Sequence, residues 1–422
     1  MTSSPLSNSP LPLLHRLSRR SAMVGVTLAL VAALAWWWAA AGTGQPFHNP
    51  LQRTNTALTG PAQHPDRSTA AGSPVPSRRV FGFLPFWNVT KTTLSPHLTD
   101  LGYFSLTLGP DGEFVRRGQD GGTDPGYRWF TSDRLQAVLR EARRGSARLH
   151  LVVTLFDNQD LETFLASPSA QLSFYQNVTP LLQTESITGL NIDFEYVGQA
   201  SPQLRAQLVS FVAGLRRHLD DRVSDYQLSL DLFPSAIERQ LLWDVPALVP
   251  HLDQLIVMAY DFHRQSSPRA GPVAPLYGDD TAVDKNIYYY LQRYTDQVPA
   301  QQLVLGVPFY GYEWQTTQSQ PDAATLPGSG ALASYSRVQQ LVTSASPDQG
   351  LVLGWSDDSL TPYLSYQFDG QTRVIHYDNA RSLGYKLDLV NQLNLAGVAI
   401  WALGYEGTAP ELWQVIDDKF QQ

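Results

Sequence analysis

Short apolar runs alternate with helical patterns through most of the chain beyond residue 79. Eight of these runs have the length and composition of strands: 80–87, 101–108, 149–156, 189–196, 227–233, 254–261, 303–310 and 397–403. Several are apolar throughout, as strands covered on both faces by helices must be. Eight parallel strands close a (β/α)8 TIM barrel, so the pattern predicts this α/β fold over residues 80–420.

The segments between the strands carry the spacing of amphipathic helices. Ser201 and Pro202 suit a helix start, because serine can accept a backbone N–H at the cap and proline is tolerated at the first helical position. A single apolar stripe follows them, formed by Leu204, Leu208, Phe211, Val212, Leu215 and Leu219. The pattern therefore predicts a helix that packs one face against the barrel.

The interval between the seventh and eighth strands is too long for one crossover helix. It holds a helical pattern at 334–345 and three short apolar runs, at 351–355, 363–367 and 372–376. Asp369-Gly370 between the last two runs is a strong hairpin signal. We therefore expect a small α+β insertion on the barrel rim, at about residues 312–380.

The fourth strand differs from the others because its polar residues alternate with apolar ones. Asn191, Asp193 and Glu195 are two residues apart and would share one face of the strand. In a sheet covered on both sides, such an acidic face has to be paired or functional, because buried carboxylates without a role are rare. The pattern favours a catalytic site at the end of this strand.

The first 79 residues divide into three predicted parts. Residues 1–21 are basic, residues 22–41 form an uncharged apolar run, and residues 42–79 are rich in Pro, Gly, Ser and Thr, as flexible linkers are. A helix of about 20 residues spans about 30 Å, the thickness of the hydrocarbon core. We expect a cytoplasmic segment and a single-pass transmembrane anchor or signal helix, with the barrel outside the cytoplasm at the cell membrane, or secreted if the helix is cleaved.

Composition excludes several classes of function. The 422 residues carry a formal net charge of −8, which disfavours a nucleic-acid partner. The chain has no cysteine, so disulfides, thiolate zinc sites and cysteine nucleophiles are absent, and its nine histidines lack ligand spacing. We expect no metal, no cofactor and a monomeric protein.

Five predicted strands carry motifs that can be recognised together. The fourth reads Asn191-Ile192-Asp193-Phe194-Glu195, and the others lie in Phe81–Trp87, Met258–Phe262, Gly306–Gly311 and Gly397–Gly404. In this order the chain resembles glycoside hydrolase family 18, the chitinase and N-acetylglucosaminidase barrels, whose fourth strand usually ends D-x-D-x-E. The resemblance covers nearly all of residues 80–420.

The resemblance implies a substrate-assisted, retaining cleavage of β-1,4 bonds next to N-acetylglucosamine, in peptidoglycan or chitin-like glycans. Glu195 would protonate the leaving oxygen, and the substrate's own acetamido oxygen would attack the anomeric carbon. Asp193 would orient the acetamido N–H and stabilise the oxazolinium intermediate. Tyr260 would bind the acetamido carbonyl.

The resemblance also implies a set of substrate-binding residues. Asp261 would lie beside Tyr260 at the strand end, and Trp401 would form an apolar floor under the reacting sugar. Trp87, Tyr310 and Trp314 are further candidates for flanking subsites. Simple core packing is the alternative for Tyr260 and for Trp401.

Asn191 departs from the family pattern, which has an aspartate there. This feature is similar to the spore-cortex and cell-wall glucosaminidase branch and favours peptidoglycan over chitin. Because asparagine is uncharged, we expect Asp193 to lack a like-charge neighbour and to stay ionised to lower pH than in an aspartate-bearing relative. Asn191 itself would contact the catalytic residues rather than act on the substrate.

Two alternatives compete with an enzyme. A chitinase-like lectin would bind aminosugars without cutting them, but such proteins typically lose the glutamate that Glu195 provides here. A structural wall-anchoring protein would use the barrel only to present the rim insertion to a partner. Hydrolysis of an aminosugar substrate that stops in Glu195→Gln separates the enzyme from both.

Overall fold

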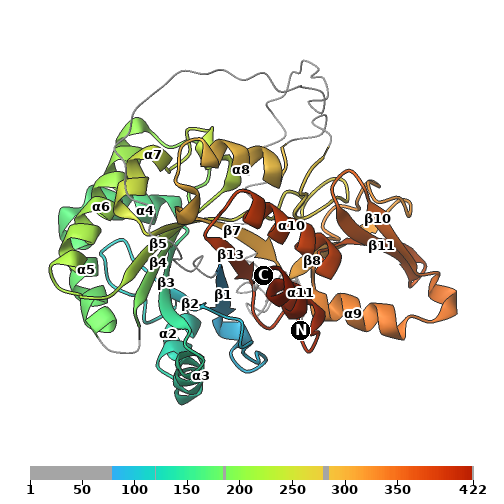
Figure 1. The fold of residues 1–422 in the computed structure, drawn as a ribbon, viewed down its shortest axis with the longest axis horizontal. Helices are drawn as coiled ribbons and strands as arrows, with labels where there is room; N and C mark the ends of the chain where they lie inside the picture. Colours follow the sequence, from blue (N-terminus) through green and yellow to red (C-terminus); the bar gives the residue numbers. More distant parts are fainter. Residues whose placement is uncertain (1–77, 119, 184–186, 279–284, 421–422) are drawn as a thin grey trace, which may run out of the picture. The chain divides into compact units, whose positions relative to one another are not determined.

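Eight parallel strands form a closed barrel in the computed structural model, which describes residues 78–118, 120–183, 187–278 and 285–420 (Figure 1). The strands are β1 (Arg79–Pro85), β2 (Asp100–Thr107), β3 (Arg148–Leu155), β4 (Gly189–Phe194), β5 (Gln227–Leu232), β6 (Gln254–Val257), β7 (Leu303–Pro308) and β13 (Gly397–Trp401). Their order around the barrel is β1-β13-β7-β6-β5-β4-β3-β2, so consecutive strands are neighbours. The predicted TIM barrel is confirmed.

Helices surround the barrel and connect its strands. They are α2 (Pro125–Phe130), α3 (Asp133–Arg144), α4 (Asn158–Ala166), α5 (Pro168–Gln183), α6 (Pro202–Asp220), α7 (Val245–Leu248), α8 (Ile287–Thr295), α10 (Ala380–Gln392) and α11 (Glu411–Phe420). Short 3-10 turns are η2 (Phe86–Asn88), η3 (Pro234–Ile237), η4 (Val249–His251), η5 (Ala300–Gln302) and η6 (Pro347–Gln349). As predicted, Ser201 caps α6: its side chain accepts the Leu204 N–H, with Pro202 at the first position.

The outward face of β4 anchors the strand in the core between barrel and helices. Ile192 and Phe194 are fully buried, and the Phe194 ring lies 5.9 Å from that of Phe164 on α4 and 5.7 Å from that of Phe211 on α6. Burying such side chains stabilises the fold by about 1.5–3 kcal/mol each. This packing fixes which face of β4 points into the barrel.

The barrel interior holds one apolar cluster and several buried polar side chains. Side chains from β1, β2, β3, β6, β7 and β13 form one apolar cluster: Phe81, Phe83, Phe104, Val152, Ile256, Val304 and Ala399. The inward positions of β4 and β5 are polar instead, with Asn191, Asp193, Ser229 and Asp231 all buried. These four residues lie on adjacent strands, and β2, β3 and β6 add the buried polar residues Asp100, His150, Thr154 and Gln254.

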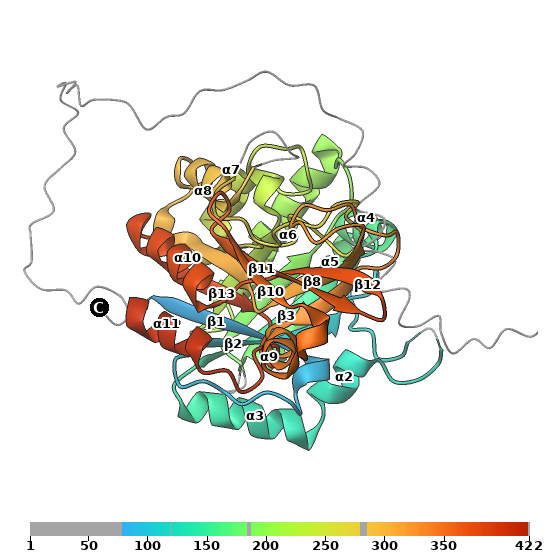
Figure 2. The same cartoon turned by 90° about the vertical axis from the view of Figure 1, so that its right-hand side faces the viewer.

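The insertion is a five-stranded antiparallel sheet with one helix. It comprises β8 (Tyr310–Thr316), β9 (Ala331–Ser334), α9 (Tyr335–Ser344), β10 (Val352–Ser356), β11 (Thr361–Phe368) and β12 (Gln371–His376), in the order β10-β11-β12-β8-β9 (Figure 2). Asp369 and Gly370 form the predicted hairpin turn, with positive φ angles of 52° and 69°. The insertion is confirmed, and β8 and β9 are two further strands that the predicted apolar runs do not include.

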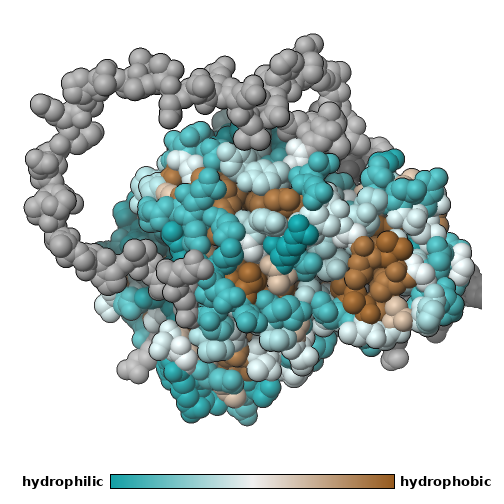
Figure 3. All heavy atoms as spheres, turned by 45° about the vertical axis from the view of Figure 1, so that its right-hand side comes forward, coloured by the Kyte–Doolittle hydropathy of each residue, from teal (hydrophilic) through white to brown (hydrophobic). Residues whose placement is uncertain are grey.

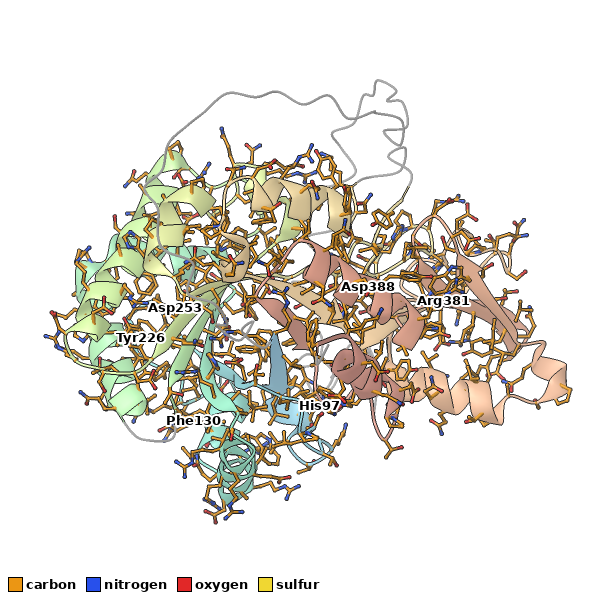
Figure 4. The ribbon with its side chains drawn as sticks, viewed as in Figure 1. His97, Phe130, Tyr226, Asp253, Arg381 and Asp388 are labelled. Carbon is orange, nitrogen blue, oxygen red and sulfur yellow. The ribbon has the colours of Figure 1, made fainter. Side chains whose placement is uncertain are left out.

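Polar side chains on the outside of the barrel form exposed pairs. Figure 4 labels Asp253, which lies 3.0 Å from Arg216 of α6, and Asp388 of α10, which lies 2.6 Å from Lys419 of α11. Exposed pairs of this kind contribute about 0–1 kcal/mol each. The guanidinium of Arg381 on α10 lies 3.8 Å above the centre of the Trp355 ring, which joins the insertion to the barrel.

Apolar side chains are exposed at the edge of the inserted sheet. Val352 and Leu353 on the edge strand β10 are 56% and 58% exposed. Figure 3 shows several apolar patches on the face that it draws, the largest at the right of the view. Within the described ranges, no helix has the length and apolarity that crossing a bilayer requires. The predicted segments 1–21 and 22–41 lie outside the described residues, as does the linker 42–79 apart from Arg78 and Arg79.

Candidate active site

The polar residues of β4 lie inside the barrel, as their alternation predicts. Asn191 is fully buried and Asp193 is 4% exposed. The two residues pair in register with neighbours that are also polar, Asn191 with Ser229 of β5 and Asp193 with Thr154 of β3. The carboxyl end of β4 therefore meets other polar side chains at the end of the barrel where catalytic residues of this fold lie.

A second buried acid, Asp231, lies beside this group on β5. The Asn191 side chain donates to Asp231 Oδ1 at 2.8 Å and to Ser229 Oγ at 3.0 Å. Asp231 is 2% exposed. Asp193 Oδ1 and Asn191 Oδ1 are buried acceptors with no hydrogen-bond partner among the described residues. The site thus holds two buried carboxylates on adjacent strands.

Burial raises the pKa of Asp193 well above its usual range, and the nearby charges of Asp231 and Glu195 raise it further. The expectation that Asn191 leaves Asp193 without a like-charge neighbour is therefore wrong. The reason is that the neighbour comes from the next strand, where a pattern read along β4 alone does not show it. Burial also raises the pKa of Asp231 well above its usual range, although the hydrogen bond from Asn191 opposes the rise.

Glu195 follows β4 directly and continues its alternation. Its backbone N–H donates to the carbonyl oxygen of Leu155 on β3 at 3.3 Å. Burial raises the pKa of Glu195 to about 7, with the Arg264 charge lowering it and the Asp261 charge raising it. A carboxyl group with a pKa near neutrality can both donate a proton and take one back, as general acid–base catalysis requires.

Asp261, in the loop after β6, is held by the inserted sheet. The hydroxyls of Tyr310 and Tyr312 on β8 both donate to Asp261 Oδ1, the second at 3.1 Å. Burial raises the pKa of Asp261, while Arg264 and the two tyrosine hydrogen bonds oppose the rise. The insertion is therefore part of the acidic site as well as of the rim.

Arg264 supplies positive charge beside these acids. Its Nε donates to the Asp261 carbonyl oxygen at 3.1 Å, and the loop is fixed by Trp314, whose Nε1 donates to the Arg264 carbonyl at 3.2 Å. No carboxylate of the described residues forms a salt bridge with Arg264. Trp314 is completely buried, so the expectation that its ring flanks a bound sugar is wrong.

Tyr260 lies at the end of β6 among the acids. Burial raises the pKa of its hydroxyl, and the charges of Asp231, Asp193, Asp261 and Glu195 raise it further. The Tyr260 ring centre is 6.2 Å from that of Tyr310. The hydroxyl therefore stays protonated and can donate a hydrogen bond.

Trp401, at the end of β13, packs among other aromatic side chains. Its ring packs edge-on against Phe104, with centres 4.6 Å apart, and lies 6.4 Å from the ring of Trp87. Trp401 contacts both the apolar cluster inside the barrel and the cluster that includes Tyr310. Trp87 is 40% exposed, so its ring remains accessible to a ligand.

Comparison with known proteins identifies the chain. It matches the profile of Glycosyl hydrolases family 18 over residues 155–406. The protein belongs to this family. It is 23% identical over 347 residues to the cortical fragment-lytic enzyme of Bacillus anthracis, covering 79% of this chain and 70% of that enzyme.

Two solved structures share the fold of this family-18 glycoside hydrolase. The Group IV chitinase of Ostrinia furnacalis superposes with a TM-score of 0.69 at 18% identity, covering 82% of this chain and 100% of that chain. The chitinase of Cycas revoluta, solved in complex with (GlcNAc)3, superposes with a TM-score of 0.67 at 20% identity, covering 81% of this chain and 99% of that chain. The resemblance to family 18 and the expectation of a glycoside hydrolase are confirmed.

The fold of this family-18 hydrolase brings most of the predicted site residues together. Asp193, Glu195, Tyr260 and Asp261 lie close enough to change one another's pKa values. Tyr310 is 3% exposed and supports Asp261 through its hydroxyl. The catalytic and sugar-binding roles of these residues stay predictions.

Three further residues belong to the site of this family-18 hydrolase: Asp231, Tyr312 and Arg264. A signal for Asp231 exists in the sequence, because Ser229 and Asp231 alternate with leucines on β5 as Asn191 and Asp193 alternate with apolar residues on β4. Tyr312 and Arg264 come just after the motifs Gly306–Gly311 and Met258–Phe262, and no alternation in the sequence marks them. Across the described residues, no group of three or more His, Asp or Glu side chains has an arrangement that could hold a metal ion.

Proposed function

We propose that the protein hydrolyses β-1,4 bonds next to N-acetylglucosamine by substrate-assisted, retaining catalysis. The observation that carries the proposal is the pKa of about 7 at Glu195, together with a buried Asp193 whose Oδ1 has no hydrogen-bond partner among the described residues. The first group suits a general acid, and the second suits an acceptor that waits for a substrate N–H.

The reaction needs two steps. Glu195 gives its proton to the glycosidic oxygen while the acetamido oxygen of the substrate bonds to the anomeric carbon, and the bond from that carbon to the leaving oxygen breaks. Glu195, now ionised, takes a proton from water as the water oxygen attacks the anomeric carbon and reopens the oxazolinium ring. Asp193 accepts the acetamido N–H and its negative charge stabilises the cationic ring.

The neighbouring side chains support this mechanism. The protonated hydroxyl of Tyr260 can donate to the acetamido oxygen and align it with the anomeric carbon. The Trp401 ring offers an apolar face to the C–H groups of the sugar, and the exposed Trp87 ring lies beside it. Asp261, held by Tyr310 and Tyr312, is placed to bind a sugar hydroxyl.

Peptidoglycan is the substrate that we favour over chitin. The relative from Bacillus anthracis is named for cortical fragment lysis, and Asn191 is similar to the cell-wall branch of the family. Arg264 adds a physical argument, because the stem peptides of peptidoglycan carry free carboxylates and chitin carries none. A guanidinium without a carboxylate partner among the described residues can bind such a group through paired hydrogen bonds.

The test compares substrates that differ only in the internal nucleophile. A 4-methylumbelliferyl chitobioside should be cleaved, whereas the matching cellobioside, which lacks the acetamido group, should not. Glu195→Gln serves as the inactive control. Equal rates on both substrates would contradict the mechanism, since the enzyme would then supply its own nucleophile.

A second measurement identifies the polymer and the bond. Purified peptidoglycan and colloidal chitin are digested under the same conditions, and the new reducing ends are identified by mass spectrometry after borohydride reduction. Products with N-acetylglucosamine at the reducing end of peptidoglycan fragments are the expected result. N-acetylmuramic acid at that end would reassign the enzyme to the other glycosidic bond.

The proposed location of the enzyme rests on the sequence of residues 1–41 alone. We propose that the basic and apolar segments export the barrel and either retain it at the membrane or are cleaved. Membrane fractionation of cells that express the full chain, with mass-spectrometric determination of its N-terminus, separates the two forms.

A further inference from the structure

Asp231 is a buried carboxylate that accepts a hydrogen bond but forms no salt bridge among the described residues. The two N–H groups of the Asn191 amide donate to Asp231 Oδ1 at 2.8 Å and to Ser229 Oγ at 3.0 Å, so both donors are satisfied. Asp231 is 2% exposed, and no cation of the described residues pairs with it in a salt bridge. A buried carboxylate without a cation is costly, so its presence calls for a role.

The surroundings of Asp231 are mostly acidic. Asn191 pairs with Ser229 and Ile192 with Leu230, so the register of β4 and β5 continues to bring Asp193 beside Asp231. Glu195 and Tyr260 are near enough to interact electrostatically with Asp231, and Asp261 and Arg264 follow Tyr260 in its loop. Two buried carboxylates on adjacent strands cannot both carry a full charge at low cost. They tend to share one proton and to titrate as a pair.

Asn191 on β4 departs from the family pattern, and its hydrogen-bond partner Asp231 lies on β5. The family pattern has an aspartate at position 191, where this chain has Asn191. The second buried acid of this chain is Asp231 on β5, and Asn191 donates a hydrogen bond to it. The site therefore keeps one amide and two buried acids, with one acid moved to the neighbouring strand.

We propose that Asp231 is a positioning residue for Asp193, replacing the aspartate that the family carries at position 191 and holding the proton of the pair while Asp193 binds the acetamido N–H. The proton leaves the Asp193 carboxyl and ends on the Asp231 carboxylate, so the pair keeps a single negative charge. Asn191 holds Asp231 in place throughout. This inference rests on the proposed substrate-assisted mechanism.

A set of nearly isosteric variants tests the proposal. In Asp231→Asn, residue 231 can still accept from Asn191 but cannot hold the proton. We expect kcat to fall about 10- to 100-fold with KM changed less than about threefold, since proton placement acts on the transition state. The acidic limb of the pH–rate profile should move to lower pH, because Asp193 loses its like-charge neighbour.

The decisive variant moves the acid back to β4. The double variant Asn191→Asp with Asp231→Asn restores one amide and two acids with their strands exchanged. It should recover at least tenfold of the activity lost in Asp231→Asn and return the acidic limb toward the wild-type position. Ser229→Ala, which removes the other acceptor of Asn191, should leave that limb in place.

Two outcomes would overturn the proposal. One is an Asp231→Asn enzyme with wild-type kcat and acidic limb, which would make Asp231 a hydrogen-bond acceptor only. The other is a double variant no more active than Asp231→Asn. Chitobioside turnover by the wild type and by Glu195→Gln is measured alongside, so failure of the proposed function is distinguished from failure of the pair.

A readout without catalysis covers the case of lost activity. Thermal unfolding of wild type and Asp231→Asn is compared from pH 5 to pH 8. Removing one of two buried like charges should raise Tm relative to wild type, and more at pH 8 than at pH 5. A constant difference between the two pH values would show that Asp193 and Asp231 do not interact, and would also overturn the proposal.

Discussion

Two buried aspartates at opposite ends of the barrel have opposite electrostatic surroundings. Asp100, the first residue of β2, is fully buried. Its carboxylate accepts from His150 Nε2 at 2.8 Å, from Arg79 Nη1 at 2.8 Å and from Thr99 Oγ1 at 2.6 Å. Burial alone would raise the pKa of Asp100, but the His150 hydrogen bond and the positive charges of His150 and Arg79 outweigh it and lower the pKa.

Asp193 lies near the carboxyl end of β4 and is buried almost as deeply as Asp100. Among the described residues it has no cationic partner. Its Oδ1 has no hydrogen bond among the described residues, its neighbours are acids, and its pKa is raised. Burial raises the pKa of both carboxylates, and the groups around each one determine whether that rise is offset, as at Asp100, or increased, as at Asp193. We call the end with Asp100 the compensated end, because cations offset the buried charge there, and the end with Asp193 the uncompensated end. The compensated end contributes stability, and the uncompensated end is available for chemistry.

The largest expected effect is at the uncompensated end. Glu195→Gln should lower kcat by two to four orders of magnitude, or about 3–5 kcal/mol, because the general acid is lost. Folding and oligosaccharide binding should remain, measured by thermal unfolding and by calorimetric titration with a chitin oligosaccharide. A variant that keeps more than half its activity on an unactivated glycan would show that Glu195 is not the acid.

Substitution at the compensated end should affect stability instead. Asp100→Asn leaves Arg79 and His150 without their carboxylate and should cost about 3–5 kcal/mol of unfolding free energy, with kcat unchanged where the enzyme is folded. Asp225→Asn is the matched control, because Asp225 is an exposed partner of Arg148 at 3.3 Å and should cost about 0–1 kcal/mol. Equal losses in urea unfolding would contradict the comparison.

Changes in pH should affect the two ends in opposite directions. Glu195 must be protonated to act, so kcat should fall about tenfold per pH unit as pH rises above about 7. Because its folded pKa is raised from 4.5 to about 7, the folded chain holds this proton longer than the unfolded chain, and stability is lost over that range as pH rises.

Asp100 gives the reverse dependence. Its folded pKa is lowered, so its contribution to stability is present above the unfolded value and is lost as pH falls through the folded pKa. Tm measured against pH should show Glu195→Gln gaining most relative to wild type near pH 8, while the deficit of Asp100→Asn shrinks on strong acidification. Parallel curves for both variants would refute the assignment.

The smallest effect is expected at Arg264. Its charge lowers the pKa of Glu195, so Arg264→Gln should move the alkaline limb of the pH–rate profile upward. The change at neutral pH should be less than about tenfold on chitobioside. A larger loss on peptidoglycan than on chitin oligosaccharides would sharpen the substrate assignment, and an unmoved limb would place Arg264 away from the acid.

The sequence was sufficient to predict the barrel because each strand carries its own signal. All eight barrel strands begin within one residue of the predicted positions, since apolar runs in a parallel sheet end at turns. The strands β8 and β9 were harder to predict. Tyr310–Thr316 directly continues the apolar run of β7, so no turn signal separates the two sheets.

For the site, the sequence pattern predicts which residues of one strand share a face, but not which residues of the neighbouring strand they meet. Asn191, Asp193 and Glu195 share a face by period alone, but whether Asp193 has a charged neighbour depends on the strand beside it. Asp231 shows this limit, because the register of β4 with β5 is a tertiary property. The role of Tyr312 depends likewise on how the inserted sheet meets the loop after β6.

The position of Tyr310 and Tyr312 at the root of β8 has a consequence for the evolution and redesign of this enzyme. The two hydroxyls that hold Asp261 belong to the first residues of the insertion, while β10 and β11 lie at its far edge. The outer strands can therefore change in length or sequence without moving the groups that orient the acid. The exposed Val352 and Leu353 lie in this outer part. New recognition surfaces can be grafted there while the chemistry is inherited intact.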